Sequence, residues 1–335
     1  MNKFNSSTKP LVWISVFLLT AAVAGCGGQD PILGTGAGTG VTVTAGPTGI
    51  TAANILGTAA PYGIAATAGI TDTLTTPITT IQGDVILVAT PTCNGTNVGG
   101  GVGSTGFDSA LGAGDSCTPT HASTPVLNAA AIVMTPTYPN TTAASGVKSD
   151  MNTAYLKLTP PAGPPAAGSL GGATNLPAGT TLGAVSGSAL VLGDNLFYPG
   201  VYQSLTSIMI TGDLTLDAQG NPNAVFVFQS SSTIGTAAGG PTPASRTRIL
   251  LVNGAKASNV WWQASTSATL GLYSEFQGNI LAAANITMKT GATSCGRLFA
   301  GAWVGSNGAF VFDSNVVSVP GQPFAPPPGY STNCQ

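Results

Sequence analysis

The sequence is short of charge. Its 335 residues include 9 Lys and Arg, 11 Asp and Glu and one His, and charged residues make up 6% of the chain. An average globular protein has about a quarter. No basic surface can therefore follow a phosphate backbone, which excludes nucleic acid as a partner. Aromatic residues are also scarce at 7%, and only one apolar run approaches the length of a membrane span, so a polytopic membrane protein is excluded as well.

Side chains for catalysis and metal binding are equally scarce. An enzyme that cleaves polysaccharides on a β-helix needs paired carboxylates, but the chain has a single Glu, Glu275, and three scattered Arg. It has no Cys-x-x-Cys pair and its only imidazole is His121, so the spacing of a zinc site is missing. We therefore expect no enzyme, and we assign no catalytic residue, no metal ligand and no cofactor.

Small and apolar residues are abundant instead. The chain has 46 Gly and 24 Pro, which alone would suggest disorder, but 43% of its residues are hydrophobic and its mean hydropathy is +0.32. That is enough apolar surface to form a core. Such a composition suits small side chains that pack at short intervals, as in a β-solenoid.

The N-terminus has the features of an export signal. Lys3 and Lys9 precede an apolar stretch from Leu11 to Ala24, and Gly25 stands directly before Cys26. This pattern resembles the lipobox of bacterial lipoproteins. The resemblance implies cleavage of residues 1–25, lipidation of Cys26 and an outer-membrane or cell-surface location, with release from the cell as an alternative. Residues 26–52 are rich in Gly and Thr and are expected to form a flexible tether.

Four further cysteines fit an exported protein. An even number in an oxidising compartment indicates two disulfides, and the sequence alone allows three connectivities. We favour Cys93 with Cys117, which bracket a Gly-rich insertion at 92–125. The second pair is then Cys295 with Cys334, which would hold the C-terminal tail at 326–335.

One amphipathic helix is predicted at 143–159 in a domain that spans 53–325. Its apolar side chains recur at helical spacing, and Pro160 and Pro161 end it. We expect this single apolar stripe to lie along the flank of a β-structure. The stripe consists of Val147, Met151, Ala154, Tyr155 and Leu158.

A repeat near the C-terminus predicts the β-architecture. The segment Ala268–Leu270 recurs as Ile286–Met288, and Gln277–Ala284 recurs at the same spacing as Cys295–Ala302. The period is the spacing from Ala268 to Ile286 along the chain. A period of this length, with Gly at the corners, is typical of one rung of a triangular β-solenoid. Because stacked rungs lie about 4.8 Å apart, a residue type that recurs in each rung forms a regular column. Thr269, Thr287 and Val311 would form one such column if they point outward.

Longer motifs resemble a known family. The run from Pro199 to Tyr202, the run from Gly212 to Gln229 and the segment Asn259–Gln263 are similar to those of the microbial ice-binding proteins. The resemblance implies a mainly β fold: a three-faced, discontinuous β-solenoid whose N- and C-terminal parts interlock, with one long α-helix packed alongside.

The resemblance also implies a function and a site. Family members bind the surface of ice crystals through a flat face of Thr, Ser and Ala, and this inhibits ice growth or recrystallisation or tethers the cell to ice. We expect a monomer whose only membrane contact is its lipid anchor. A structural or adhesive cell-surface lipoprotein is the alternative. Glu275 and Lys289 are expected near the predicted face, which consists of Thr269, Ser274, Thr287, Thr290 and Thr293.

Overall fold

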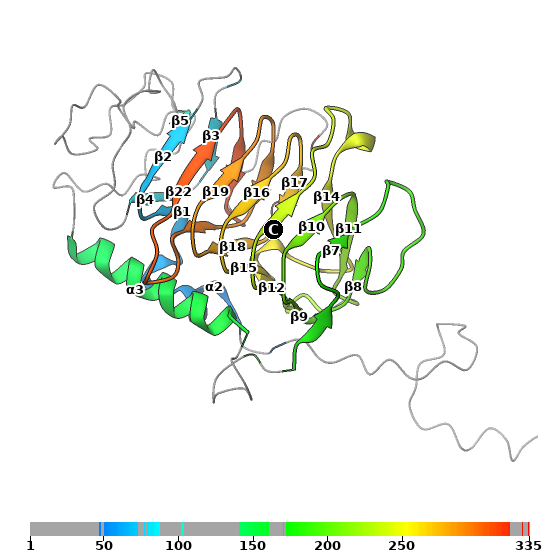
Figure 1. Ribbon diagram of the computed structural model, residues 1–335, viewed down its shortest axis with the longest axis horizontal. Helices are drawn as coiled ribbons and strands as arrows, with labels where there is room; N and C mark the ends of the chain where they lie inside the picture. Colours follow the sequence, from blue (N-terminus) through cyan, green and yellow to red (C-terminus); the bar gives the residue numbers. More distant parts are fainter. Residues whose placement is uncertain are drawn as a thin grey trace, which may run out of the picture. The chain divides into compact units, whose positions relative to one another are not determined.

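Short parallel strands form three sheets that wind around one apolar core (Figure 1). No helix among the residues described is long and apolar enough to cross a membrane. Apart from β5, the expected insertion at 92–125 lies outside the described residues, as do Cys93, Cys117 and the N-terminal signal. The computed structural model describes residues 47, 50–72, 77, 79–82, 84–87, 102–103, 141–160, 170, 172–321, 330 and 334.

Sheet A has eight strands among the described residues and carries the longest helix of that part of the chain on its outer surface. Residues of β15 are all buried, because one side of the sheet faces the core and the other faces the helix. In spatial order the strands are β4 (Asp84–Leu87), β1 (Tyr62–Ala66), β21 (Leu298–Ala300), β18 (Asn279–Ala282), β15 (Val260–Ala264), β12 (Phe226–Ser230), β9 (Gly200–Ser204) and β6 (Thr174–Leu176).

In the described part of the chain, sheet B has seven strands, most of them very short. Several alternate between buried and exposed residues, which indicates that one side faces the core and the other faces solvent. In spatial order the strands are β2 (Gly69–Asp72), β22 (Ala309–Phe312), β19 (Ile286–Met288), β16 (Ala268–Leu270), β13 (Ile234–Thr236), β10 (Ile208–Ile210) and β7 (Thr180–Leu182).

Sheet C completes the triangle, with eight strands in the segments that the structure describes. In spatial order these are β5 (Val102–Gly103), β3 (Thr79–Gln82), β23 (Val316–Ser318), β20 (Thr293–Cys295), β17 (Glu275–Gln277), β14 (Arg248–Val252), β11 (Asp213–Asp217) and β8 (Leu196–Phe197).

The order of the strands is discontinuous in sequence. Rungs follow one another along the chain from β6, β7 and β8 to β21, β22 and β23, and the N-terminal strands β1, β2 and β3 then stack on this last rung. In register, Ile64 pairs with Leu298 and Ile70 pairs with Phe310. Figure 1 shows the blue and cyan N-terminal strands beside the orange C-terminal ones. The predicted discontinuous, three-faced β-solenoid is confirmed.

The sequence repeat corresponds to rungs without inserted loops. Trp261 pairs with Asn279, which lies one repeat later in the chain, and Thr269 pairs with Thr287 at the same spacing. The corner between sheets C and A requires Gly296, which has φ 149°, because a Cβ there would overlap the carbonyl oxygen of Gly278. The sequence repeat therefore reflects both the pairing of strands in neighbouring rungs and the tight corner at Gly296.

Aromatic rings stack inside the triangle from rung to rung. The rings of Phe228 and Trp262 lie 4.2 Å apart between centroids, and Tyr202 stacks on Phe228 at 5.2 Å. Trp262 is fully buried, and its indole N–H donates to the carbonyl of Gln277 at 3.0 Å. Such pairs contribute about 0.5–1.5 kcal/mol each beyond their buried area. A rigid core of this kind holds the outer faces in place.

The predicted helix is confirmed as α3 (Thr141–Leu158), which packs on sheet A beside α2 (Ala52–Leu56) and η1 (Gly57–Ala59). From Gly146 to Leu158, where the side chains of α3 are described, the buried ones are those of the predicted stripe: Val147, Met151, Ala154, Tyr155 and Leu158.

Hydrogen bonds hold α3 to the solenoid at its middle and at its C-terminus. In the middle of the helix, the Lys148 ammonium donates to the carbonyls of Gly301, Trp303 and Ser306. Burial lowers the pKa of Lys148 to about 8. At its C-terminus, the Gln229 amide donates to the carbonyl of Leu158 at 2.6 Å and so satisfies one of the last carbonyl groups of the helix.

Candidate functional site

The outward surface of sheet B, which we call face B, carries a central column of side chains. In β7, β10 and β16 the middle residue is exposed and both of its neighbours are buried, as alternation along a strand requires. Parallel register aligns the middle residues of all seven strands. In spatial order the column consists of Thr181, Met209, Gly235, Thr269, Thr287, Val311 and Thr71.

Two further rows border this column. They consist of the residues two positions before and two positions after the central ones. Backbone hydrogen bonds keep the rungs aligned there; the N–H of Ile208, for example, donates to the carbonyl of Thr233 at 2.9 Å. The first row holds Gly179, Ser207, Thr233, Ser267, Asn285, Ala309 and Gly69. The second row holds Gly183, Thr211, Ala237, Gly271, Lys289 and Asp313.

Face B is therefore a regular grid of small side chains. Its rungs lie about 4.8 Å apart, and successive outward positions along one strand lie about 6.6 Å apart. Most positions carry a hydroxyl, a methyl or no side chain, and the charged residues Lys289 and Asp313 lie in the same border row on neighbouring rungs. Thr is restricted at χ1 by its branched Cβ, so its hydroxyl and methyl groups are held in place.

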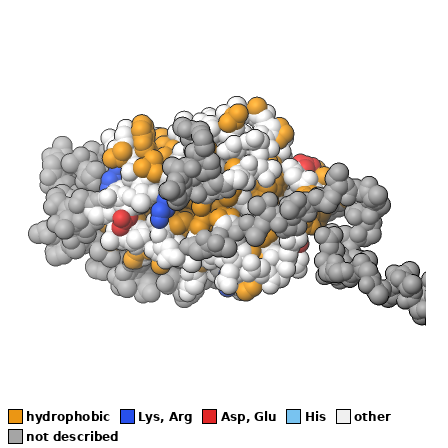
Figure 2. Space-filling view, turned by 90° about the horizontal axis from the view of Figure 1, so that it is seen from below, with side chains coloured by type: hydrophobic (Ala, Val, Ile, Leu, Met, Phe, Trp, Pro, Cys, Tyr) orange, Lys and Arg blue, Asp and Glu red, His pale blue; other side chains and the backbone are white. Residues whose placement is uncertain are grey.

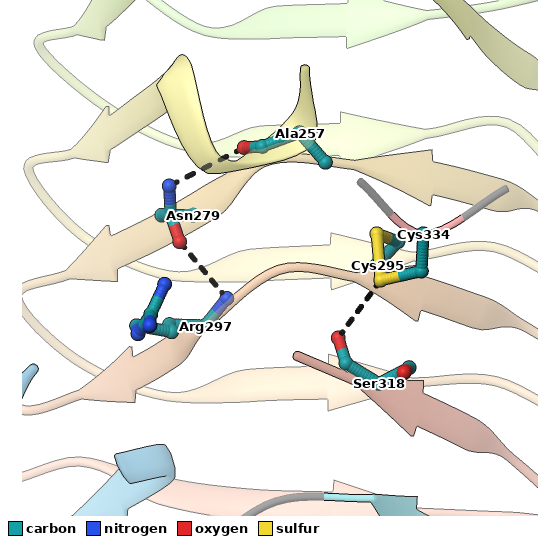
Figure 3. Close-up of a disulfide and its surroundings, with 6 residues drawn as sticks. All are labelled: Ala257, Asn279, Cys295, Arg297, Ser318 and Cys334. Carbon is teal, nitrogen blue, oxygen red and sulfur yellow. Dashed lines mark hydrogen bonds between the residues drawn. A yellow bond between two sulfur atoms is a disulfide. The ribbon is translucent and has the colours of Figure 1, made fainter. Parts of the chain in front are cut away.

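Described residues outside the strands pack on the outer surfaces of the other two sheets. Helix α3 lies on the outer surface of sheet A. On the outer surface of sheet C, Cys334 forms a disulfide with Cys295 of β20, with the two Cα atoms 5.3 Å apart (Figure 3). The tail is also held by Tyr330, whose hydroxyl donates to the carbonyl of Gly291 at 2.8 Å. The expected pairing of Cys295 with Cys334 is confirmed.

Four charged side chains in or next to the strands of sheet C form two ion pairs. Arg246 pairs with Glu275 at 2.9 Å, both are buried, and the guanidinium also lies 3.5 Å from the ring centre of Tyr330. Arg248 pairs with Asp213 at 2.6 Å, and this hydrogen-bonded contact raises the pKa of Arg248. Glu275 is buried at the start of β17 in sheet C, where it pairs with Thr293 of the predicted face, so it is not exposed on face B. Lys289 is exposed at the border of face B.

The structure brings together only part of the predicted site. Thr269 and Thr287 are neighbours in the central column of face B. Thr290 lies in the turn after β19, and its hydroxyl donates to the Asp313 carboxylate at 2.5 Å. Thr290 and Asp313 are only partly buried.

Ser274 and Thr293 were expected on the exposed face but are buried. The Ser274 hydroxyl donates to the carbonyl of Gly271 at 2.8 Å, and Thr293 lies in β20, where it pairs with Glu275. The chain turns from sheet B to sheet C after Gly271 and again after Gly291. The short segments on either side of these turns therefore belong to different faces.

Several face B residues were missed in the sequence. Thr181 pairs with Met209, and Met209 pairs with Gly235, but both pairs are further apart in the chain than the sequence repeat. These rungs contain longer loops, so a search for the shorter period does not detect them. The alternation of apolar and outward residues along a strand could have identified them. Ile208 and Ile210, for example, are buried on either side of Met209, which therefore points outward.

Hydroxyl and methyl groups are the main chemical groups that face B presents. Among the described residues, no three His, Cys, Asp or Glu side chains lie close enough to hold a metal ion. Figure 2 shows one side of the molecule, where charged side chains form a few separate spots among uncharged and hydrophobic ones. Face B can offer ordered hydroxyl and methyl groups at fixed spacing, and little else.

Comparisons with known proteins give one consistent result. A family model described as "Ice-binding-like" matches residues 64–317. An ice-binding protein from Nostoc sp. (strain HG1) is 46% identical over 132 residues, which cover 39% of this chain and 44% of that protein. An ice-binding protein from Flavobacterium frigoris (strain PS1) is 34% identical over 129 residues, covering 38% and 41%. The matched part thus spans less than half the length of these curated relatives.

Solved structures agree with the fold. The crystal structure of an ice-binding protein from the Antarctic ascomycete Antarctomyces psychrotrophicus has a TM-score of 0.52 at 28% identity, covering 78% of this chain and 96% of that one. An ice-binding protein from an Antarctic biological consortium has a TM-score of 0.53 at 26% identity, covering 85% and 96%.

Proposed function

The chain belongs to the ice-binding-like family, and on that premise we propose that it binds the surface of ice crystals through face B. Binding would inhibit the growth or recrystallisation of ice, or attach the cell to it. One copy suffices in this proposal, because face B lies within a single chain. The observation that carries the proposal is the column of outward-facing middle residues, which contains Thr181, Thr269 and Thr287.

The chemistry of the column supports adsorption to ice. A strongly charged face would orient water by its own field, whereas hydroxyls that alternate with methyls leave water free to adopt the order of a crystal. Immobilising a loose side chain at an interface costs about 0.5–1.5 kcal/mol. Thr269 and Thr287 avoid most of this cost, because each is β-branched and held on a short strand between buried neighbours.

The arrangement of the three faces also supports this assignment. A helix covers sheet A, and Cys334 and Tyr330 hold the C-terminal tail against sheet C. Among the described residues, sheet B has exposed middle residues that include Thr181 in the terminal strand β7 and Thr269 in β16. A crystal surface is flat and extended, so it is matched by a face whose residues are exposed along a row of strands.

We further propose that a lipid on Cys26 anchors the protein at the cell surface. The support is the sequence pattern of Lys3 and Lys9, the apolar stretch from Leu11 to Ala24 and the small residue before Cys26. An anchored protein with a tether could hold ice beside the cell, and a released form could restrain the growth of ice outside it.

The test is to place a large side chain in the column. Thr269→Tyr and Thr287→Tyr should each abolish most of the thermal hysteresis and the inhibition of recrystallisation, because the ring would hold the rest of face B away from the ice. The matched control is Thr153→Tyr, on the exposed side of α3. All three variants should keep the melting temperature of the parent.

Two results would contradict the proposal. If the column variants retain full activity, face B is not the binding surface. If the parent protein has no activity at tens of micromolar, ice binding itself is excluded, and a structural or adhesive role at the cell surface becomes the better account.

A further inference from the structure

The hydroxyl column of face B is interrupted at two successive rungs. Met209 and Gly235 occupy the central position between Thr181 on one side and Thr269 on the other. Neither residue carries a hydroxyl. The run of Thr side chains is therefore divided into a single residue at one end and the pair Thr269 and Thr287 further along.

Met209 fills the space that Gly235 leaves open. Gly235 is an outward position, because Ile234 and Thr236 on either side point to the core, yet Gly235 is itself buried. A Cβ on Gly235 would lie 3.2 Å from the terminal methyl of Met209 and 3.3 Å from its sulfur. The Met209 side chain thus lies across the neighbouring rung, while 39% of the residue stays exposed.

The backbone does not require glycine at this position. The φ angle of Gly235 is not positive, and the residue lies in the middle of strand β13, where β-branched residues are favoured. The flexible end of Met209 is the nearest obstacle to a side chain there, and Met has three rotatable bonds that allow it to move. A hydroxyl residue could therefore stand at both rungs.

We propose that Met209, folded over Gly235, limits how tightly face B binds ice. This inference rests on the proposed function and identifies the residues that set its strength. Met209 places a mobile apolar chain in the middle of the face, so binding must immobilise it. It also separates hydroxyl groups that would otherwise engage the crystal together, and contacts that act together strengthen one another.

The test is the double variant Met209→Thr/Gly235→Thr. It would place Thr at five successive rungs, from Thr181 to Thr287, and thermal hysteresis at equal concentration should rise about twofold or more. Met209→Thr alone should give a smaller rise, because the gap at Gly235 stays open. Gly235→Thr alone should reduce activity, because the new side chain displaces Met209 outward from the face.

A matched control exchanges an exposed apolar residue for Thr elsewhere. Val304 is 66% exposed in the loop after β21, where its N–H donates to Asn152 of α3, and Val304→Thr should leave activity unchanged. Melting temperatures are measured for every variant. If the double variant folds poorly, Met209→Thr alone decides the question.

The outcomes separate this inference from the proposed function. An active parent whose activity does not rise in the double variant, or in Met209→Thr where the double variant is unstable, overturns the inference and leaves ice binding intact. A parent without activity, whose double variant is also inactive, overturns both. A rise that Val304→Thr reproduces would also overturn the inference, because it would show that the effect does not depend on face B.

Discussion

At the scale of single residues, polar groups are used differently inside the triangle and on face B. Trp262 and Tyr202 both stack in the core, and each donates a hydrogen bond to a backbone carbonyl. Thr269 is exposed on face B. A buried polar group is stabilised by a partner within the protein, whereas an exposed hydroxyl can bind ordered water.

Tyr202 gives a prediction about pH. Its hydroxyl donates to the carbonyl of Tyr198 at 2.7 Å, and burial raises its pKa from 10.0 to about 12. The unfolded chain loses this proton near pH 10 and the folded chain near pH 12. The contribution of Tyr202 to the free energy of unfolding is therefore complete below pH 10 and is lost as the pH rises from 10 to 12.

Denaturant unfolding of the parent and of Tyr202→Phe at a series of pH values measures this effect. Between pH 10 and 12 the parent should lose more stability than the variant, because Phe has no proton to lose. Parallel profiles would show that Tyr202 ionises as readily in the folded state as in the unfolded one.

At the scale of elements, the C-terminal tail makes a separate contribution to stability. The disulfide between Cys295 and Cys334 closes a loop with a sequence separation of 39 residues. Cys334→Ser should lower the free energy of unfolding by about 2–4 kcal/mol, because the unfolded chain regains the freedom that the crosslink removes. Thermal hysteresis should not change, because the tail lies on sheet C.

Denaturant unfolding and an ice assay on the same Cys334→Ser sample test both parts. Unchanged stability would mean that the crosslink does not constrain the unfolded chain. A loss of ice activity in a variant that is still folded would place the tail in the binding surface.

Elements with a regular pattern could be predicted from the sequence. The apolar stripe from Val147 to Leu158 predicted α3, and the short repeat predicted the rungs that hold Thr269 and Thr287. Both depend on short-range periodicity. The stacking of the N-terminal strands on the last C-terminal rung was predicted only from the resemblance to the ice-binding family, because no local pattern indicates it.

The site was less predictable than the fold. Ser274 and Thr293 follow face B residues closely in sequence, but the turns at Gly271 and Gly291 carry them to sheet C, where they are buried. A residue's face depends on where the corner falls, and a small shift along the chain exchanges one face for another. Thr181 was missed for another reason, because the loops around it are longer than the repeat.

At the scale of the whole molecule, several of the few charged side chains make structural contacts. The side chains of Arg246, Glu275, Arg248 and Asp213 are used in ion pairs on sheet C, and Lys148 is used to hold α3 to the solenoid. The central column of face B contains no charged residue. Among the described residues, sheet A packs against a helix, sheet C is bonded to Cys334 and sheet B carries the exposed Thr residues of face B.

The most direct test of the central claim is the fate of the protein at a growing ice front. Fluorescently labelled protein is added to a single ice crystal that grows slowly, and its concentration is measured in the ice and in the remaining liquid. The account predicts that the parent and Thr153→Tyr accumulate in the ice, whereas Thr269→Tyr is excluded from it. Exclusion of the parent, or accumulation of Thr269→Tyr to the same level as the parent, would contradict it.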